Sequence, residues 1–243
     1  MQKSIEIIKG SNQKKILMDI TFPKKSNNKL IIFSHGFKGF KDWGCFNLIS
    51  KIFAENGFTF LKFNFSHNGT TIADPLNFND LEAFGNNNFS IELNDLSLVL
   101  DWSVQNLNIS DITLLGHSRG GGVSMLKSGE DKRVKRVISW SSPSSFLNRA
   151  STDRVEIWKQ KGVSFVYNGR TKQNMPLYIQ LYNDCEQNKE RLDIQNSVSN
   201  LTISQLVIHG DADPSVDVKE AYDLHRWNPR SELFIVKDAD HVF

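Results

Sequence analysis

A short apolar strand, a serine flanked by glycines and a helix are encoded together in residues 111–122, whose sequence is DITLLGHSRGGG. Ile112–Leu115 is an apolar, β-prone run, and Val123–Lys127 can continue as a helix. Between them, Gly116–Gly120 matches G-x-S-x-G, in which a serine stands on a sharp, strained turn between strand and helix. The stretch therefore predicts that the Ser118 hydroxyl is exposed at the carboxyl edge of a sheet. There, the free N–H groups of a helix N-terminus can stabilise an oxyanion.

Short apolar runs alternate with helical patterns along the chain. The expected strands are residues 4–8, 15–22, 30–33, 58–65, 112–115, 134–140, 206–209 and 232–236, and the expected helices are 43–56, 90–106, 123–127 and 216–227. The first two strands form an antiparallel hairpin, a long polar loop runs from after Thr71 to about Asn88, and Ser90 is the expected N-cap of the longest helix. This alternation predicts an α/β fold with a mostly parallel central sheet and helices on both faces. In such sheets, ligands bind beyond the carboxyl ends of the strands.

The length of 243 residues suits a single domain, 1–243, with one substantial core. Residues 143–203 interrupt the alternation and contain several aromatic side chains among many polar ones. An insertion on the ligand side of the sheet predicts a small cap that supplies apolar substrate contacts, for which Trp158 and Tyr167 are the candidates. A structural excursion with its own small core explains the same pattern equally well.

Composition restricts the classes of partner and cofactor. The chain has 29 Lys and Arg against 27 Asp and Glu, so its charge indicates neither a nucleic acid nor a membrane surface as partner. Cys45 and Cys185 lack metal-ligand spacing, and the sequence has no phosphate-binding glycine motif, so we expect neither a metal nor an organic cofactor. The N-terminus is charged and lacks the apolar region of a signal peptide, and no run approaches a membrane span. We therefore expect a soluble, cytoplasmic protein.

A nucleophilic serine needs a histidine as general base and a carboxylate that orients the histidine. His241 follows the last expected strand in the sequence DADH and is the candidate base. Asp211 and Asp213 both follow the strand at 206–209. Asp213 lies further along this loop and is the candidate acid, whereas Asp211 is the alternative and better suits a role in holding the turn.

Two backbone N–H donors are needed to stabilise the oxyanion. One candidate is the amide of Arg119, the residue after the serine, and the other is the amide of Phe37, which follows a strand and His35-Gly36. The Phe37 ring also suits the wall of a substrate pocket. His117 is a further candidate substrate contact, although a histidine in a glycine turn most often braces the backbone.

With these motifs in this order, the chain resembles the α/β-hydrolase fold family, whose chain order is serine, acid, histidine. The segments HGFKGFKDWG at 35–44, GHSRGG at 116–121, HGDADPSV at 209–216 and DADHVF at 238–243 are most similar to small bacterial serine hydrolases. These are of the serine aminopeptidase-like, acylaminoacyl-peptidase-like or feruloyl-esterase-like kinds. Two features depart from the family. SHNG at 66–69 replaces an Arg-Gly-His-Gly-type turn, and the sequence ends at Phe243 where relatives continue into a helix.

The expected activity is that of a serine hydrolase that cleaves an ester, amide or thioester of a small, uncharged acyl substrate through an acyl-enzyme. A carboxylesterase ranks above an aminopeptidase or acyl-peptidase, because the sequence shows no charged pocket for a peptide terminus. A non-catalytic ligand-binding protein with the same fold is the alternative from another class. A complete set of serine, aspartate and histidine argues against it. The sequence leaves the oligomeric state open.

Overall fold

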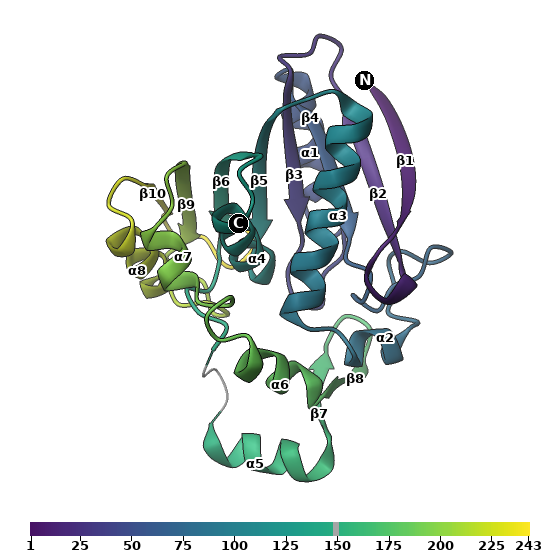
Figure 1. Ribbon diagram of the computed structural model, residues 1–243, viewed down its shortest axis with the longest axis vertical. Coiled ribbons are helices and arrows are strands. Elements are labelled where there is room, and N and C mark those ends of the chain that lie inside the picture. The colour runs from purple at the N-terminus through teal and green to yellow at the C-terminus, as the bar shows by residue number, and fades with distance from the viewer. Residues whose placement is uncertain (148–150) are drawn as a thin grey trace.

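The computed structural model describes residues 1–147 and 151–243, and a mixed sheet of eight strands forms its centre (Figure 1). The strands lie in the order β1-β2-β4-β3-β5-β6-β9-β10. Their bounds are β1 Gln2–Lys9, β2 Lys15–Phe22, β3 Lys29–Ser34, β4 Thr59–Asn64, β5 Asp111–His117, β6 Val134–Trp140, β9 Ser204–Gly210 and β10 Glu232–Val236. β2 pairs antiparallel with β1 and β4, and the other pairs are parallel. The predicted mostly parallel sheet with an antiparallel N-terminal hairpin is confirmed.

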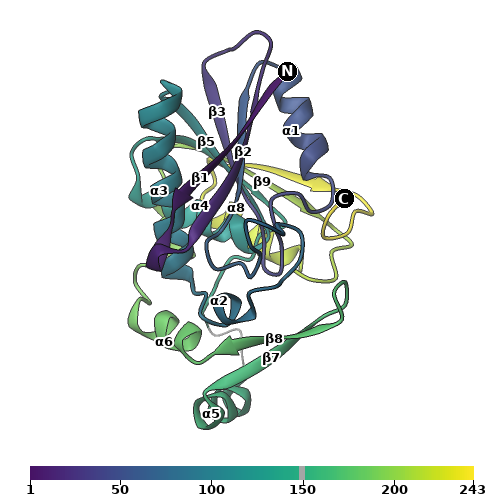
Figure 2. The ribbon, with the colours of Figure 1, turned by 90° about the vertical axis from the view of Figure 1, so that its right-hand side faces the viewer.

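Helices cover both faces of this sheet, as predicted. Their bounds are α1 Phe46–Glu55, α2 Leu81–Gly85, α3 Phe89–Leu107, α4 Arg119–Glu130, α5 Thr152–Lys161, α6 Gln180–Gln187, α7 Ile194–Ser199 and α8 Lys219–Trp227, with a 3₁₀ turn at Ser11–Gln13. α3, α4, α7 and α8 bury side chains in one large apolar core. α1 packs on the opposite face of the sheet from α3 (Figure 2). There, the ring centroids of Phe46 and Phe33 lie 4.4 Å apart. Within the described ranges, no helix is long and apolar enough to cross a membrane.

Two local predictions between β4 and α3 are wrong. The N-cap of α3 is Asn88 instead of Ser90, because the Asn88 side chain accepts a hydrogen bond from the amide of Ile91 at 2.8 Å. The predicted polar loop contains α2, whose N-cap Asp80 accepts a hydrogen bond from the amide of Ala83 at 2.9 Å. A helix of five residues is too short to show a helical period in the sequence.

Beyond the carboxyl ends of the central strands, the chain forms α5, the hairpin of β7 (Val163–Asn168) and β8 (Gln173–Tyr178), and α6 (Figure 1). We call this group the cap. α6 contacts α3, and β8 contacts α2, so the cap is attached to the main body next to these two helices. The predicted insertion extends to about 203, but α7 packs against α4 and α8 and buries Ile194 and Val198 in the main core. The cap therefore ends before α7. Residues 148–150 of the predicted insertion lie outside the described residues.

Candidate active site

Ser118 stands on the turn between β5 and α4 with φ 54° and ψ −125°. A positive φ is uncommon for a residue with a side chain and costs of order 1–3 kcal/mol. Hydrogen bonds on both sides hold this conformation: the amide of Ser118 donates to the carbonyl of Trp140 at 2.8 Å, and its carbonyl accepts from the amide of Gly121 at 2.9 Å. Backbone strain that the surrounding structure maintains in this way is typical of functional sites.

The turn also depends on two close backbone approaches. A Cβ atom on Gly120 would lie 2.2 Å from the carbonyl oxygen of Ser34, so the first turn of α4 packs directly against the end of β3. A Cβ atom on Gly36 would lie 2.9 Å from the Cβ of Ser118, so the loop after β3 lies directly against the serine. Only glycine permits these distances, and together they bring the two predicted oxyanion segments to Ser118.

The backbone amides of Phe37 and Arg119 belong to these two segments. Arg119 is the first residue of α4, where an N–H has no partner within the helix and the helix dipole is positive. Among the residues that the structure describes, neither amide donates a hydrogen bond to a protein acceptor. Both N–H groups can therefore bind an oxygen that develops negative charge next to Ser118.

Asp213 and His241 form a hydrogen bond on the loops that follow β9 and β10. Nδ1–H of His241 donates to Oδ2 of Asp213 at 2.7 Å, while Oδ1 of Asp213 accepts from the amides of Ser215 and Val216 at 2.8 and 2.9 Å. Burial raises the pKa of Asp213. The hydrogen bonds from His241 and from the two amides outweigh burial, so the pKa lies below its ordinary value. An ionised Asp213 fixes the proton of His241 on Nδ1 and leaves Nε2 as a base.

Asp211, the alternative acid, has a different partner. Its Oδ1 accepts a hydrogen bond from the amide of Asp238 at 2.6 Å, and its own amide donates to the carbonyl of Val236. Asp211 therefore ties the loop after β9 to the loop after β10. Its hydrogen-bond partners differ from those of the Asp213–His241 pair.

His117 connects the serine turn to the loop of His241. Its Nε2–H donates to the backbone carbonyl of His241 at 2.8 Å, and the two rings lie 4.8 Å apart between centroids. Burial lowers the pKa of His117 to about 4, so the ring is neutral near pH 7. His35 has the same character: burial lowers its pKa to about 4, and its Nδ1–H donates to the carbonyl of Gly36 at 2.9 Å. Both histidines brace the backbone of the site.

A cavity of about 220 Å³ contains both Ser118 and His241, together with the predicted contacts Phe37 and His117. Its other lining residues are Gly36, Lys38, Gly39, Trp43, Phe46, Asn168 and Arg170. Lys38 and Trp43 belong to the segment at 35–44, which was identified from the sequence without a role being assigned to either residue. Asn168 and Arg170 lie on the β7–β8 hairpin of the cap, and no motif in the sequence predicted that they line the cavity.

The structure does not bring Trp158 and Tyr167, the two cap residues predicted as substrate contacts, to this cavity. Trp158 lines a separate cavity of about 420 Å³ between α5 and α6, and its indole N–H donates to the carbonyl of Leu177 at 2.7 Å. Tyr167 is 58% exposed. The side chains of an antiparallel strand point alternately to its two faces, and a sequence with no clear alternation could not show which face meets the serine.

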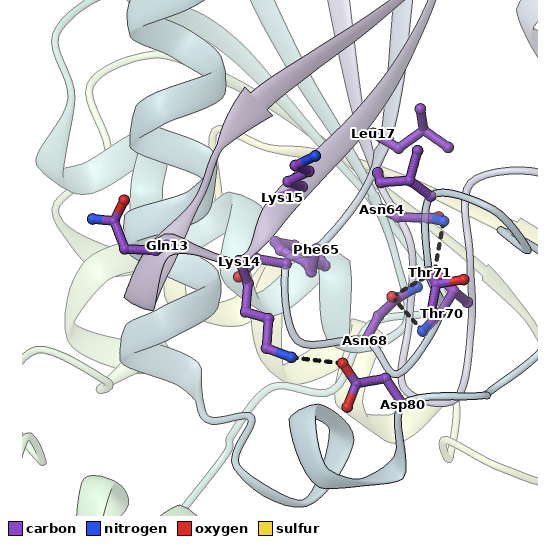
Figure 3. A pocket seen from close by; sticks show the side chains of 12 residues that line it. Gln13, Lys14, Lys15, Leu17, Asn64, Phe65, Asn68, Thr70, Thr71 and Asp80 are labelled. Atoms are coloured by element: carbon purple, nitrogen blue, oxygen red, sulfur yellow. Dashed lines mark hydrogen bonds and ion pairs between the residues drawn. The ribbon is translucent and has the colours of Figure 1, made fainter.

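A third cavity, of about 240 Å³, lies beside the β1–β2 hairpin and is lined by neither Ser118 nor His241 (Figure 3). In it, Lys14 forms an ion pair with Asp80 at 2.6 Å, and the Thr70 hydroxyl donates to Oδ1 of Asn68 at 2.8 Å. Nδ2 of Asn68 also donates to the carbonyl of Gly39 at 3.2 Å. The unusual SHNG turn at 66–69 therefore supports the loop that carries Phe37.

Comparisons with known proteins agree with this architecture. A family model described as alpha/beta hydrolase fold matches residues 29–199. The structure is similar to Est1E from Butyrivibrio proteoclasticus with bound ferulic acid, with a TM-score of 0.78 and 18% identity over 98% of this chain and 91% of that one. The alpha/beta hydrolase GrgF from Penicillium sp. sh18 gives a TM-score of 0.76 and 16% identity over 100% and 92% of the two chains. The esterase domain of a Rhodothermus marinus protein gives 0.68 and 18% over 100% and 90%. A search of curated proteins finds no significant match. Structural likeness at these identities concerns the fold alone.

Proposed function

Since the chain belongs to the α/β hydrolase fold family, we propose that it is a serine hydrolase that cleaves an ester of a small acyl group through an acyl-enzyme. One observation carries this proposal: Ser118 on its strained turn and His241, which is hydrogen-bonded to Asp213, line one cavity although they are 123 residues apart in sequence. The names of two similar structures, Est1E bound to ferulic acid and an esterase domain, accord with ester chemistry.

In the proposed reaction, the Ser118 hydroxyl attacks the ester carbonyl while Nε2 of His241 takes its proton. Asp213 stabilises the imidazolium that forms, and the amides of Phe37 and Arg119 stabilise the oxyanion. The tetrahedral intermediate collapses, and His241 returns the proton to the departing alcohol. Water then attacks the acyl-enzyme with His241 as base again and releases the acid and free Ser118.

An aminopeptidase is the less favoured candidate. A free peptide N-terminus is a cation and needs a carboxylate partner, yet among the described residues no Asp or Glu lines the cavity of Ser118. Lys38 and Arg170 line it instead, and they would repel an ammonium group. A binding protein without catalysis is also less favoured, because it has no use for the backbone strain at Ser118.

Labelling with a fluorophosphonate probe, read by intact mass, tests this proposal. We expect one adduct on the wild-type protein and none on Ser118→Ala, together with a loss of p-nitrophenyl butyrate turnover on the order of 10⁶-fold. Ser215→Ala is the matched control, because it removes a hydroxyl from the loop of Asp213 but retains the amide that Asp213 uses. A folded wild-type protein that forms no adduct, or a Ser118→Ala variant that retains turnover, would overturn the proposal.

A further inference from the structure

Positive charge lies at the cavity of Ser118. Among the described residues that line it, Lys38 and Arg170 carry a full positive charge at neutral pH, and none is an aspartate or glutamate. Lys38 follows the oxyanion residue Phe37, whereas Arg170 lies in the turn between β7 and β8 of the cap. The rings of Trp43 and Phe46 form apolar wall in the same cavity.

Neutral partners hold the Lys38 ammonium in place. Its Nζ donates to the carbonyl of Tyr167 at 3.2 Å and lies 5.9 Å from the centroid of the Phe37 ring. An ammonium group has three N–H donors, so this backbone contact leaves two for a ligand. Lys38 therefore contributes a positioned charge that the contact with the cap does not neutralise.

Arg170 is held more firmly. Its Nη2 donates to the carbonyl of Leu76 at 2.7 Å, its Nη1 donates to Oδ1 of Asn77 at 3.3 Å, and its guanidinium lies over the rings of Phe40 and Phe78 at 5.0 and 5.5 Å. All four of these partners are uncharged. The nearby carboxylate of Asp74 hydrogen-bonds to Nδ2 of Asn77 instead. A guanidinium that is already ordered loses little entropy when it binds an anion.

The volume of the cavity limits the group that it can hold. Its volume of about 220 Å³ lies below the roughly 300–1,000 Å³ of pockets that hold drug-sized ligands, so the cavity suits a short acyl chain such as a succinyl group. A cavity of this size with apolar walls and one sign of charge attracts a short organic anion and concentrates it there.

We propose that the substrate is an ester carrying a carboxylate a few bonds from the scissile carbonyl, such as a half-ester of a four- or five-carbon dicarboxylic acid, and that Lys38 and Arg170 bind this carboxylate. Water hydrolyses the ester to the acid and the alcohol, and this reaction rests on the proposed function. The binding of the carboxylate by Lys38 and Arg170 does not depend on the proposed function. The charged group replaces the uncharged substrate expected from the balanced composition.

Two matched pairs of esters test the selectivity. p-Nitrophenyl hemisuccinate is compared with p-nitrophenyl levulinate, in which a methyl ketone replaces the carboxylate. 4-Carboxyphenyl butyrate is compared with its methyl ester, which places the charge on the alcohol side. Exposed ion pairs contribute up to about fivefold each, so we expect kcat/KM to favour the anionic member of at least one pair by about tenfold. The preference should shrink in about 0.5 M salt, because screening weakens it.

Variants show whether this preference comes from Lys38 and Arg170. We expect Lys38→Gln and Arg170→Gln each to lower the preference, measured as the ratio of kcat/KM within each ester pair, by about two- to fivefold, and the double variant to abolish it. Lys172→Gln is the matched control, because it removes a positive charge from the same turn but does not line the cavity. Equal turnover of charged and neutral esters in the wild type, or a preference that survives the double variant, would overturn the proposal.

A binding measurement separates this proposal from the proposed function. Ser118→Ala cannot form an acyl-enzyme, and we expect it to bind glutarate in calorimetry, with affinity lost in the Lys38→Gln/Arg170→Gln background. If the wild type does not react with fluorophosphonate but glutarate binding depends on both cations, the serine hydrolase fails and the anion site stands. If labelling succeeds and glutarate does not bind, the anion site fails and the hydrolase stands.

Discussion

Replacing Glu92 by glutamine should slow the acylation of Ser118 about tenfold while the protein stays folded. Glu92 lies on α3, is 3% exposed, and its Oε1 accepts hydrogen bonds from Nδ2 of Asn87 at 2.7 Å and from Nη1 of Arg119 at 3.3 Å. The Arg119 guanidinium also lies 4.3 Å from the ring centroid of Phe37 and 4.8 Å from that of Phe89. The two residues whose amides are proposed to bind the oxyanion, Phe37 and Arg119, are thus joined by their side chains, and Glu92 anchors the pair.

The size of the effect follows from what glutamine retains. Loss of one oxyanion donor costs about 10²–10³ in kcat, but both amides remain in Glu92→Gln and only their relative position loosens. About tenfold, or about 1.4 kcal/mol, is therefore the expected loss in kcat. Leaving one partner of a buried ion pair alone costs about 3–5 kcal/mol of stability. Because Arg119 is still packed between two rings and its side chain is 14% exposed, we expect a cost nearer to about 2 kcal/mol.

Steady-state hydrolysis of p-nitrophenyl butyrate, with kcat and KM measured from about pH 5 to 9, provides the readout. A positioning role predicts a lower kcat with little change in KM. Burial raises the pKa of Glu92 even though Arg119 lowers it. Wild-type kcat should therefore fall at low pH as Glu92 gains a proton. The part of this fall that comes from Glu92 should be absent in the glutamine variant. Glu130→Gln is the matched control, because Glu130 pairs with Lys127 at the far end of α4. Wild-type kcat in Glu92→Gln, or an equal loss in the control, would refute the reasoning.

Three further predictions concern the acid, the serine turn and a buried histidine. Asp213→Asn should lower kcat by about 10⁴-fold, and Asp211→Asn far less, in the same assay; equal losses would contradict the assignment of the acid. Gly120→Ala should destabilise the protein by more than about 3 kcal/mol in thermal unfolding, because its Cβ would lie 2.2 Å from a backbone oxygen, whereas Gly169→Ala, with nothing within 4 Å, should not. Burial lowers the pKa of His35 from 6.5 to about 4, so the unfolded chain binds a proton there before the folded protein does. Stability should therefore fall as the pH drops from 6.5 towards 4, by up to about 1.4 kcal/mol per unit from this group, and His35→Gln should reduce the slope in chemical denaturation by that amount.

The central strands could be predicted because they are buried on both faces. Such strands are largely apolar runs, and the predicted bounds of β3 and β4 lie within one residue of the structure at both ends. The start of α3 could not be predicted in the same way, because Asn88 and Ser90 are both good capping residues. Contacts with the cap decide between them: Nδ2 of Asn88 donates to Gln180 at 2.6 Å, and the amide of Ser90 donates to Asp184 at 3.1 Å. These partners are about ninety residues away, and no local pattern marks them.

The candidate catalytic residues were visible in the sequence because each follows a strand of the sheet. Ser118 follows β5, Asp213 follows β9 and His241 follows β10, and these parallel strands end at the same edge. Asp213 was preferred to Asp211 because it lies two residues further along the loop after β9. In the structure, Asp213 is hydrogen-bonded to His241. The residues that form the walls of the cavity follow no such rule. Which side chains of the β7–β8 hairpin line the cavity depends on how the hairpin lies over the sheet.

The charge of the cavity shows most clearly what a sequence total hides. A net charge of +2 is a sum over 56 charged side chains and contains no information on which of them meet. Lys38 and Arg170 are 132 residues apart, and they line one cavity because the β7–β8 turn lies against the loop after β3, where Lys38 contacts Tyr167. Their partners are neutral, so the two charges are not cancelled locally. Selectivity in this protein should therefore follow the few charges that the cap brings to Ser118, and an anionic ester is the substrate that these charges favour.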